Sequence, residues 1–148
     1  MEIYTSRWAN KELAHLDVVP VGISRGVPRW PLPYRYKLLR LLAPSRETFE
    51  LRDLQEFEQA YLAALEEIGV KKIARALQKI SDEHGGRSLA LLCYENILAG
   101  ETCHRRMFAD WWKQQTTQEV PELDGRVEVK PQTLMQEILS ETKEVNKG

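Results

Sequence analysis

The feature that most constrains the fold is an apolar run within residues 87–95, which read "RSLALLCYE". A run of this length and composition is typical of a strand that is covered on both faces, as the strands of parallel sheets are. Two shorter β-branched segments precede it, at residues 2–5 and 17–24, and we interpret both as buried strands. Pro20 weakens the second prediction, or else marks the first residue of the strand, because proline cannot donate to the ladder of a central strand.

Apolar residues at helical spacing predict further elements. The expected helices cover residues 34–42, 54–68, 70–80 and 103–115. Gly69 separates the second helix from the third, and Pro44 ends the first, since a residue before proline disfavours helical geometry.

This order of strands and helices predicts the α/β class, as a single compact domain with a small, mostly parallel sheet flanked by helices. We assign residues 1–125 to the domain. Residues 126–148 are expected to form a C-terminal extension, with a weak strand at 126–130 followed by a helix that docks on the body or on a partner.

The composition argues against a membrane or secreted protein. No apolar stretch approaches the roughly 20 residues that cross a bilayer, and the N-terminus lacks the basic flank and apolar core of a signal peptide. We therefore expect a cytoplasmic protein with no membrane contact. In that compartment its two cysteines are expected to be reduced thiols rather than a disulfide.

The net charge of −1 gives the chain no overall attraction to nucleic acid or acidic lipid. The charges are unevenly distributed, however, because residues 18–46 contain no acidic residue. The basic residues there are Arg25, Arg29, Arg35, Lys37, Arg40 and Arg46. Such a segment in a nearly neutral chain indicates a focused anion site rather than a general polyanion-binding surface.

The clearest candidate site follows the strand at 87–95. Ligands of α/β sheets bind beyond the carboxyl ends of the strands, where Cys93 and Glu95 are expected. Thr102 is a suitable N-cap for the next helix, whose first turn would hold Cys103, His104 and Arg105. Free backbone N–H groups and the helix dipole favour an anion there and lower the pKa of a thiol. On the helical wheel Arg105 borders the apolar stripe and is expected to contact the ligand, whereas Arg106 is expected to pair with Asp110 at the surface.

Structural roles for the same residues remain open. Cys93 can be a small buried apolar residue, and His104 can be a core histidine that bonds a backbone carbonyl. The ten-residue gap between the cysteines matches no standard zinc spacing, so we expect no metal and no other cofactor.

A second loop could open onto the same crevice, if the strands carrying Ser24 and Cys93 are parallel neighbours. In it Arg25 and Arg29 would hold an anion, and Trp30 would stack on a base. Tyr4 and Ser6, at the end of the first strand, could join from the same side. Alternatively, this proline-rich loop simply covers a core.

Five segments together resemble the family called domain of unknown function 488, over residues 3–123. They read "EIYTSRW", "VVPVGISRGVPRW", "YRYKLLRLLAP", "LALLCYE" and "CHRRMFADWW". The resemblance implies a compact α/β fold and a shared pocket, but no particular reaction. The pocket residues it implies are Cys93, Glu95, Cys103, His104 and Arg105 from the motif, and Tyr4, Ser6 and Ser24 from the strand ends. Many members carry Asp-x-Arg on the second strand, where this chain has Ile23-Ser24-Arg25, so Glu95 is the one carboxylate we nominate.

Three hypotheses follow for function. In the first, the protein is an enzyme acting on a phosphate-bearing ligand, a nucleotide or nucleic-acid end, at Cys93, Glu95, Cys103 and His104, with the arginines holding the anion. In the second, it is a non-catalytic module that binds nucleic acid or protein through the basic aromatic loop 24–40. In the third, the motif is structural, with Arg105 pairing Glu95.

Overall fold

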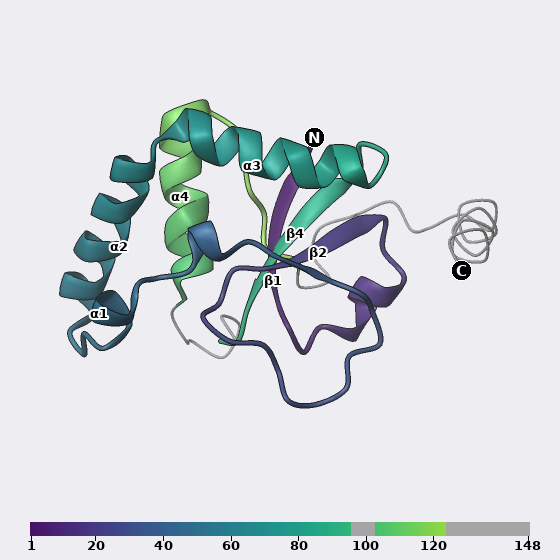
Figure 1. The fold of residues 1–148 in the computed structure, drawn as a ribbon, viewed down its shortest axis with the longest axis horizontal. Coiled ribbons are helices and arrows are strands. Elements are labelled where there is room, and N and C mark those ends of the chain that lie inside the picture. Colours follow the sequence, from purple (N-terminus) through teal and green to yellow (C-terminus); the bar gives the residue numbers. More distant parts are fainter. Residues whose placement is uncertain (96–102, 124–148) are drawn as a thin grey trace.

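The computed structural model describes residues 1–95 and 103–123, which form an α/β domain around a four-stranded sheet, as predicted (Figure 1). The strand order is β1 (Ile3–Arg7), β4 (Ser88–Cys93), β2 (Val18–Gly22) and β3 (Lys37–Leu38), and all neighbouring strands are parallel. The central strand β4 is the apolar run, and its residues from Leu89 to Cys93 are buried. Parallel pairing therefore places the carboxyl ends of β1, β4 and β2 at one edge of the sheet.

Strand β2 lies within the predicted segment 17–24 and begins at Val18, so Pro20 does not mark its first residue. Pro20 lies opposite Ala90 of β4 in the middle of the strand. Ile23 donates its N–H to Leu92 of β4, whereas Gly22 accepts from Leu39 on the opposite side. Because backbone groups alternate along a strand, the nitrogen of Pro20 faces the β3 side, where β3 pairs only with Val21 and Gly22. Proline costs this strand no hydrogen bond to β4.

The helix expected over 34–42 was also wrong. The segment instead forms the short strand β3 and a 3₁₀ helix, Arg40–Leu42. Its apolar residues occur in pairs, which a short edge strand and a single helical turn accommodate as well as an α-helix does. Leu42 is fully buried against the core.

The helices cover one face of the sheet. They are α1 (Arg46–Phe49), α2 (Leu54–Ile68), α3 (Val70–Glu83) and α4 (His104–Thr116). Asp53 caps α2 by accepting from the Glu56 N–H, and Gly69, at φ 90°, allows the sharp turn between α2 and α3. Helices α2 and α4 pack side by side (Figure 1).

The two faces of the sheet carry separate apolar clusters. The larger one joins Ile3, Val21 and Leu91 to the helices, and the smaller one joins Tyr4, Trp8 and other residues beneath the 3₁₀ helix Lys11–Ala14. Alternate residues of a strand point to opposite faces of the sheet. This alternation determines which strand residues can reach the pocket.

The predicted boundary at 125 and the predicted extension over 126–148 lie outside the described residues. Among residues 1–95 and 103–123, no helix has the length and apolar character that crossing a bilayer requires.

Candidate functional site

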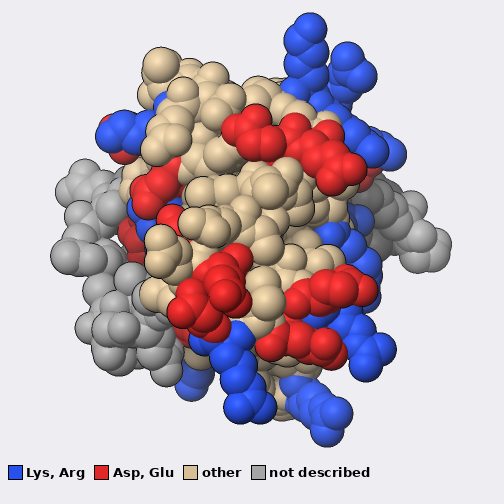
Figure 2. All heavy atoms as spheres, turned by 90° about the vertical axis from the view of Figure 1, so that its left-hand side faces the viewer, with Lys and Arg blue, Asp and Glu red and all other residues tan. Residues whose placement is uncertain are grey.

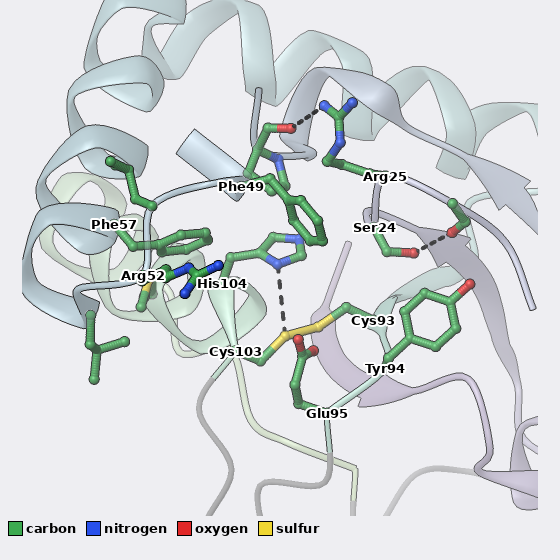
Figure 3. Close-up of a pocket in the computed structure, with 15 residues that line it drawn as sticks. Ser24, Arg25, Phe49, Arg52, Phe57, Cys93, Tyr94, Glu95, Cys103 and His104 are labelled. Atoms are coloured by element: carbon green, nitrogen blue, oxygen red, sulfur yellow. Dashed lines mark hydrogen bonds between the residues drawn. A yellow bond between two sulfur atoms is a disulfide. The ribbon is translucent and has the colours of Figure 1, made fainter. Parts of the chain in front are cut away.

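A pocket of about 470 Å³ opens at the carboxyl edge of the sheet, next to the start of α4 (Figure 3). Its volume lies within the range of small-molecule sites. The wall includes six residues that the sequence nominated, namely Ser24, Arg25, Cys93, Glu95, Cys103 and His104. The loop after β2 and the loop after β4 thus meet at one cavity, because β2 and β4 are parallel neighbours.

The two cysteines form a disulfide, so the expectation of separate reduced thiols was wrong for this structure. Cys93 ends β4 and Cys103 directly precedes α4, at its N-cap position, and their Cα atoms lie 7.4 Å apart. The cause is the fold, which returns the chain from the exit of β4 to α4 on the same edge of the sheet. Spacing in the sequence could not show this return. The expected N-cap, Thr102, lies outside the described residues.

His104 is a buried, neutral imidazole at the floor of the pocket. Its Nε2 lies 2.7 Å from the carbonyl oxygen of Ile23 and donates to it, which leaves the lone pair on Nδ1. That Nδ1 lies 3.8 Å from Cys103 Sγ. The pKa of His104 is lowered to about 4, mainly by burial. The hydrogen bond to the Ile23 carbonyl acts to raise this pKa, whereas the nearby Arg105 charge lowers it. At neutral pH the ring is therefore a lone-pair donor and a weak base.

Arg105 lies beneath the pocket rather than in it, contrary to the expected ligand contact. Its side chain is 0% exposed and forms an ion pair with Glu122, with Nε–Oε1 at 3.1 Å and Nη2–Oε2 at 3.0 Å. Its Nη2 also donates to the carbonyl oxygen of Glu95 at 2.7 Å, and its Nη1 to Cys93 Sγ at 3.0 Å. The structural hypothesis thus named the right arginine with the wrong carboxylate.

Arg106 is also placed differently from the expected surface pair with Asp110. Its Nη1 donates to Thr5 Oγ1 at 2.8 Å and to the Val120 carbonyl at 2.6 Å, which ties α4 to β1.

Glu95 lines the pocket and keeps one polar atom free. Its Oε2 is buried and has no hydrogen-bond partner among the described residues. In Figure 3 the carboxylate points toward the two sulfur atoms. A buried carboxylate oxygen without a partner is costly, so this atom is suited to a group that binds in the pocket.

Ser24 uses its hydroxyl to shape the loop. The Ser24 Oγ accepts from Trp8 Nε1 at 2.9 Å and donates to the Gly26 carbonyl at 2.6 Å. Arg25 extends along the pocket, donates to the Pro44 carbonyl at 3.1 Å, and lies 5.8 Å from the Phe49 ring centre.

Besides Arg105, four nominated residues do not line the pocket. Tyr4 and Ser6 point to the opposite face of the sheet, where Tyr4 donates to Glu2 and Ser6 to the Leu123 carbonyl. Arg29 and Trp30 lie further along the loop. Trp30 is 47% exposed and packs edge-on against Tyr94, with ring centres 6.1 Å apart, so it reaches the site through another aromatic ring.

Several residues that line the pocket were not predicted from the sequence. Among them are Phe49, Arg52 and Phe57, and also Tyr94, which lies beside the disulfide. Figure 3 shows Arg52 and Phe57 on one side of His104 and Tyr94 on the other. Burial raises the pKa of the Tyr94 hydroxyl, which therefore stays protonated at neutral pH. Tyr94 could have been suspected from its place between Cys93 and Glu95, whereas nothing in the sequence places the α1–α2 connection here.

The charges of the site contrast with those of the neighbouring surface. Arg52 has no carboxylate partner in the part of the chain that the structure describes. Helix α2, by contrast, carries Glu56, Glu58, Glu66 and Glu67 and no basic residue. Figure 2 shows acidic side chains grouped across the face that includes this helix, with basic side chains mostly around its edge.

Comparison with known proteins identifies a family. The family model described as "Domain of unknown function DUF488" matches residues 19–112, which is more than half of the chain and includes Cys93, Glu95, Cys103 and His104. No curated protein and no solved structure matches the chain.

Proposed function

The chain belongs to the family described as "Domain of unknown function DUF488", and from its pocket we propose that it is a small enzyme acting on a phosphate-bearing ligand of nucleotide size. One observation carries the proposal. A single cavity of about 470 Å³ joins two guanidinium groups, three aromatic rings and a floor of Cys103, His104 and Glu95. Guanidinium groups bind phosphate, and aromatic rings stack on a base or another flat group.

Each part of the pocket has a role in this proposal. Arg25 and Arg52 hold the anion, and Phe49, Phe57 and Tyr94 contact the rest of the ligand. The reactive end is the floor, where Glu95 serves as acid or base. Arg105 is a positioning residue, because it contacts Cys93 and the Glu95 backbone while remaining fully buried. The proposal includes a cytoplasmic location, where the cysteine pair can be reduced.

The acidic surface favours this enzyme over the alternative nucleic-acid module. A long polyanion that crossed the α2 face would meet its glutamates, whereas a small ligand held by Arg25 and Arg52 would not. The exposed side chain of Trp30 favours the alternative hypothesis, in which the loop 24–40 is a binding surface.

The first prediction tests the anion contact. We expect Arg52→Ala to weaken binding of adenosine monophosphate about 10- to 100-fold, because a charge-assisted hydrogen bond contributes about 1.5–3 kcal/mol. Binding is measured by calorimetry at fixed ionic strength, with adenosine as the ligand that lacks phosphate. Arg75→Ala, on α3 and outside the pocket, is the control with the same change of charge.

Equal binding by the parent and Arg52→Ala, or no binding of the nucleotide by either, would contradict the proposal. A single-stranded oligonucleotide that binds more tightly than the mononucleotide, with an affinity that falls steeply with salt and ignores Cys103→Ser, would instead support the non-catalytic module.

A further inference from the structure

Three side chains with metal-binding atoms meet at the floor of the pocket. Cys93 Sγ, Cys103 Sγ and a ring nitrogen of His104 all lie within 4.8 Å of one another, and all three residues are buried. In a tetrahedral zinc site, with Zn–S bonds of about 2.3 Å and Zn–N bonds of about 2.0 Å, neighbouring ligand atoms are roughly 3.5–3.8 Å apart. The 3.8 Å between Cys103 Sγ and His104 Nδ1 already matches this spacing.

The orientation of the imidazole favours a metal over simple packing. Histidines that bind metals usually donate their other ring N–H to a carboxylate or a backbone carbonyl, which fixes the ring and its tautomer. His104 makes this hydrogen bond from Nε2 to the Ile23 carbonyl, at 2.7 Å. A core histidine would explain that contact, but it leaves Nδ1 with a sulfur atom as its one hydrogen-bonding neighbour among the described residues.

The surrounding charges suit two thiolates and a divalent cation. Arg105 Nη1 lies 3.0 Å from Cys93 Sγ, and the charge of Arg105 is itself balanced by Glu122. Two thiolates and one Zn²⁺ are together neutral, so the buried cluster would carry no uncompensated charge. The N-terminus of α4 adds its positive dipole at Cys103.

Once the disulfide is reduced, the separation of the two cysteine backbones leaves room for an ion between the sulfurs. The Cα atoms of Cys93 and Cys103 lie 7.4 Å apart, whereas disulfides usually join Cα atoms about 4.4–6.8 Å apart. The ten-residue gap between the cysteines matches no standard zinc motif, but the fold brings Cys93, Cys103 and His104 together despite that gap.

We propose that the reduced protein binds one Zn²⁺ through Cys93 Sγ, Cys103 Sγ and His104 Nδ1, with the fourth position open to the pocket. A dithiol reductant supplies two electrons and two protons to the disulfide and is itself oxidised to a disulfide, and Zn²⁺ then displaces the two thiol protons to solvent. Three protein ligands and an open position are typical of catalytic zinc. Glu95 then lies where it can exchange a proton with a zinc-bound water, and this last part rests on the proposed function.

The experiment uses the full chain, reduced with a phosphine and freed of metal by a chelator. Zn²⁺ is titrated against a chromophoric competitor, and Co²⁺ is added as a spectroscopic probe, both without nucleotide. We expect one Zn²⁺ per chain, and a thiolate-to-Co²⁺ charge-transfer band with the visible bands of a tetrahedral ion. Protein oxidised with diamide should show neither.

Variants identify the ligands. His104→Ala should weaken Zn²⁺ binding at least tenfold, because even mutating a residue that only hydrogen-bonds to a metal ligand costs about 10- to 100-fold in affinity. Cys103→Ser removes one of the two thiolates and should weaken or abolish the charge-transfer band. His15→Ala, at an exposed histidine, should bind as the parent does. Folding of each variant is checked by circular dichroism, and the comparison of reduced with oxidised parent decides the question even if Cys103→Ser fails to fold.

The inference is overturned if the reduced, folded parent binds no stoichiometric metal, or if His104→Ala binds Zn²⁺ as tightly as the parent. Arg52→Ala separates this inference from the proposed function, because it should keep full Zn²⁺ affinity while nucleotide binding falls. Zinc binding without nucleotide binding would leave the metal site standing and remove the proposed ligand.

Discussion

Arg105 shows how one residue can be essential to the site without touching a ligand. Its guanidinium is removed from solvent and donates to Glu122, to the Glu95 carbonyl and to Cys93. A buried cation is tolerated only with such partners, since an unpaired one carries a large desolvation cost. The arginine therefore ties the exit of β4, which carries Cys93, to the start of α4, which follows Cys103.

We predict that Glu122→Ala lowers the free energy of unfolding by about 3–5 kcal/mol, because it leaves the Arg105 charge buried without its counter-ion. Urea unfolding followed by tryptophan fluorescence measures the loss. Glu119→Ala removes the carboxylate of an exposed ion pair with Lys113, and it should cost less than about 1 kcal/mol. Similar losses for the two variants would refute the structural role assigned to Glu122.

At this scale the sequence could identify the residue types but not their partners. The helical wheel placed Arg105 at the border of the apolar face, and burial there was foreseeable. Glu122 lies beyond the end of α4, in a segment without periodicity that reaches Arg105 only because it bonds to β1 at Thr5. No spacing rule links positions 105 and 122.

Among the elements, the exit of β2 controls the shape of the loop that lines the pocket. A Cβ added to Gly22 would lie 2.4 Å from Trp8 Cζ2. Trp8 is 1% exposed and donates to Ser24, so its ring cannot move without disturbing the start of the loop. The absence of a side chain at Gly22 thus allows the indole to support Ser24 from below.

We predict that Gly22→Ala destabilises the protein by about 1–3 kcal/mol, the usual range for added volume in a packed core. The matched control is Gly26→Ala in the same loop, where the new Cβ would meet only Tyr94 Oη at 3.9 Å, and the expected change is below about 0.5 kcal/mol. Thermal unfolding of both variants provides the comparison. If the control unfolds at the lower temperature, the close contact with Trp8 is not the cause.

The strands and long helices were predictable because their patterns are local. Parallel pairing then placed Ser24, Cys93 and Glu95 at one edge, as the sequence analysis expected. Tyr4 and Ser6 end a strand at the same edge, but the pleat turns them to the other face, and their alternation with Ile3 could have shown this. The helix predicted over residues 34–42 was wrong because the paired leucines of this segment fit more than one kind of short element.

For the whole molecule, the bond between Cys93 and Cys103 links the sheet to the last described helix. We predict that reduction in the presence of a chelator lowers the free energy of unfolding by about 2–3 kcal/mol, because it releases a loop closed over ten residues. Urea midpoints with and without a phosphine measure the change. Cys103→Ser should show no response to the phosphine, and equal midpoints for the oxidised and reduced parent would contradict the expectation.

The family match ends at Trp112, yet the contacts described above extend further. Val120 accepts from Arg106, Glu122 neutralises Arg105, and Leu123 donates to Thr5 of β1. Strand β1 in turn precedes the start of the match and flanks the central strand along its length. We therefore expect the smallest fragment that folds on its own to extend from β1 to at least Leu123, and we expect a chain growing from its N-terminus to complete its interior only after that late segment has been synthesised.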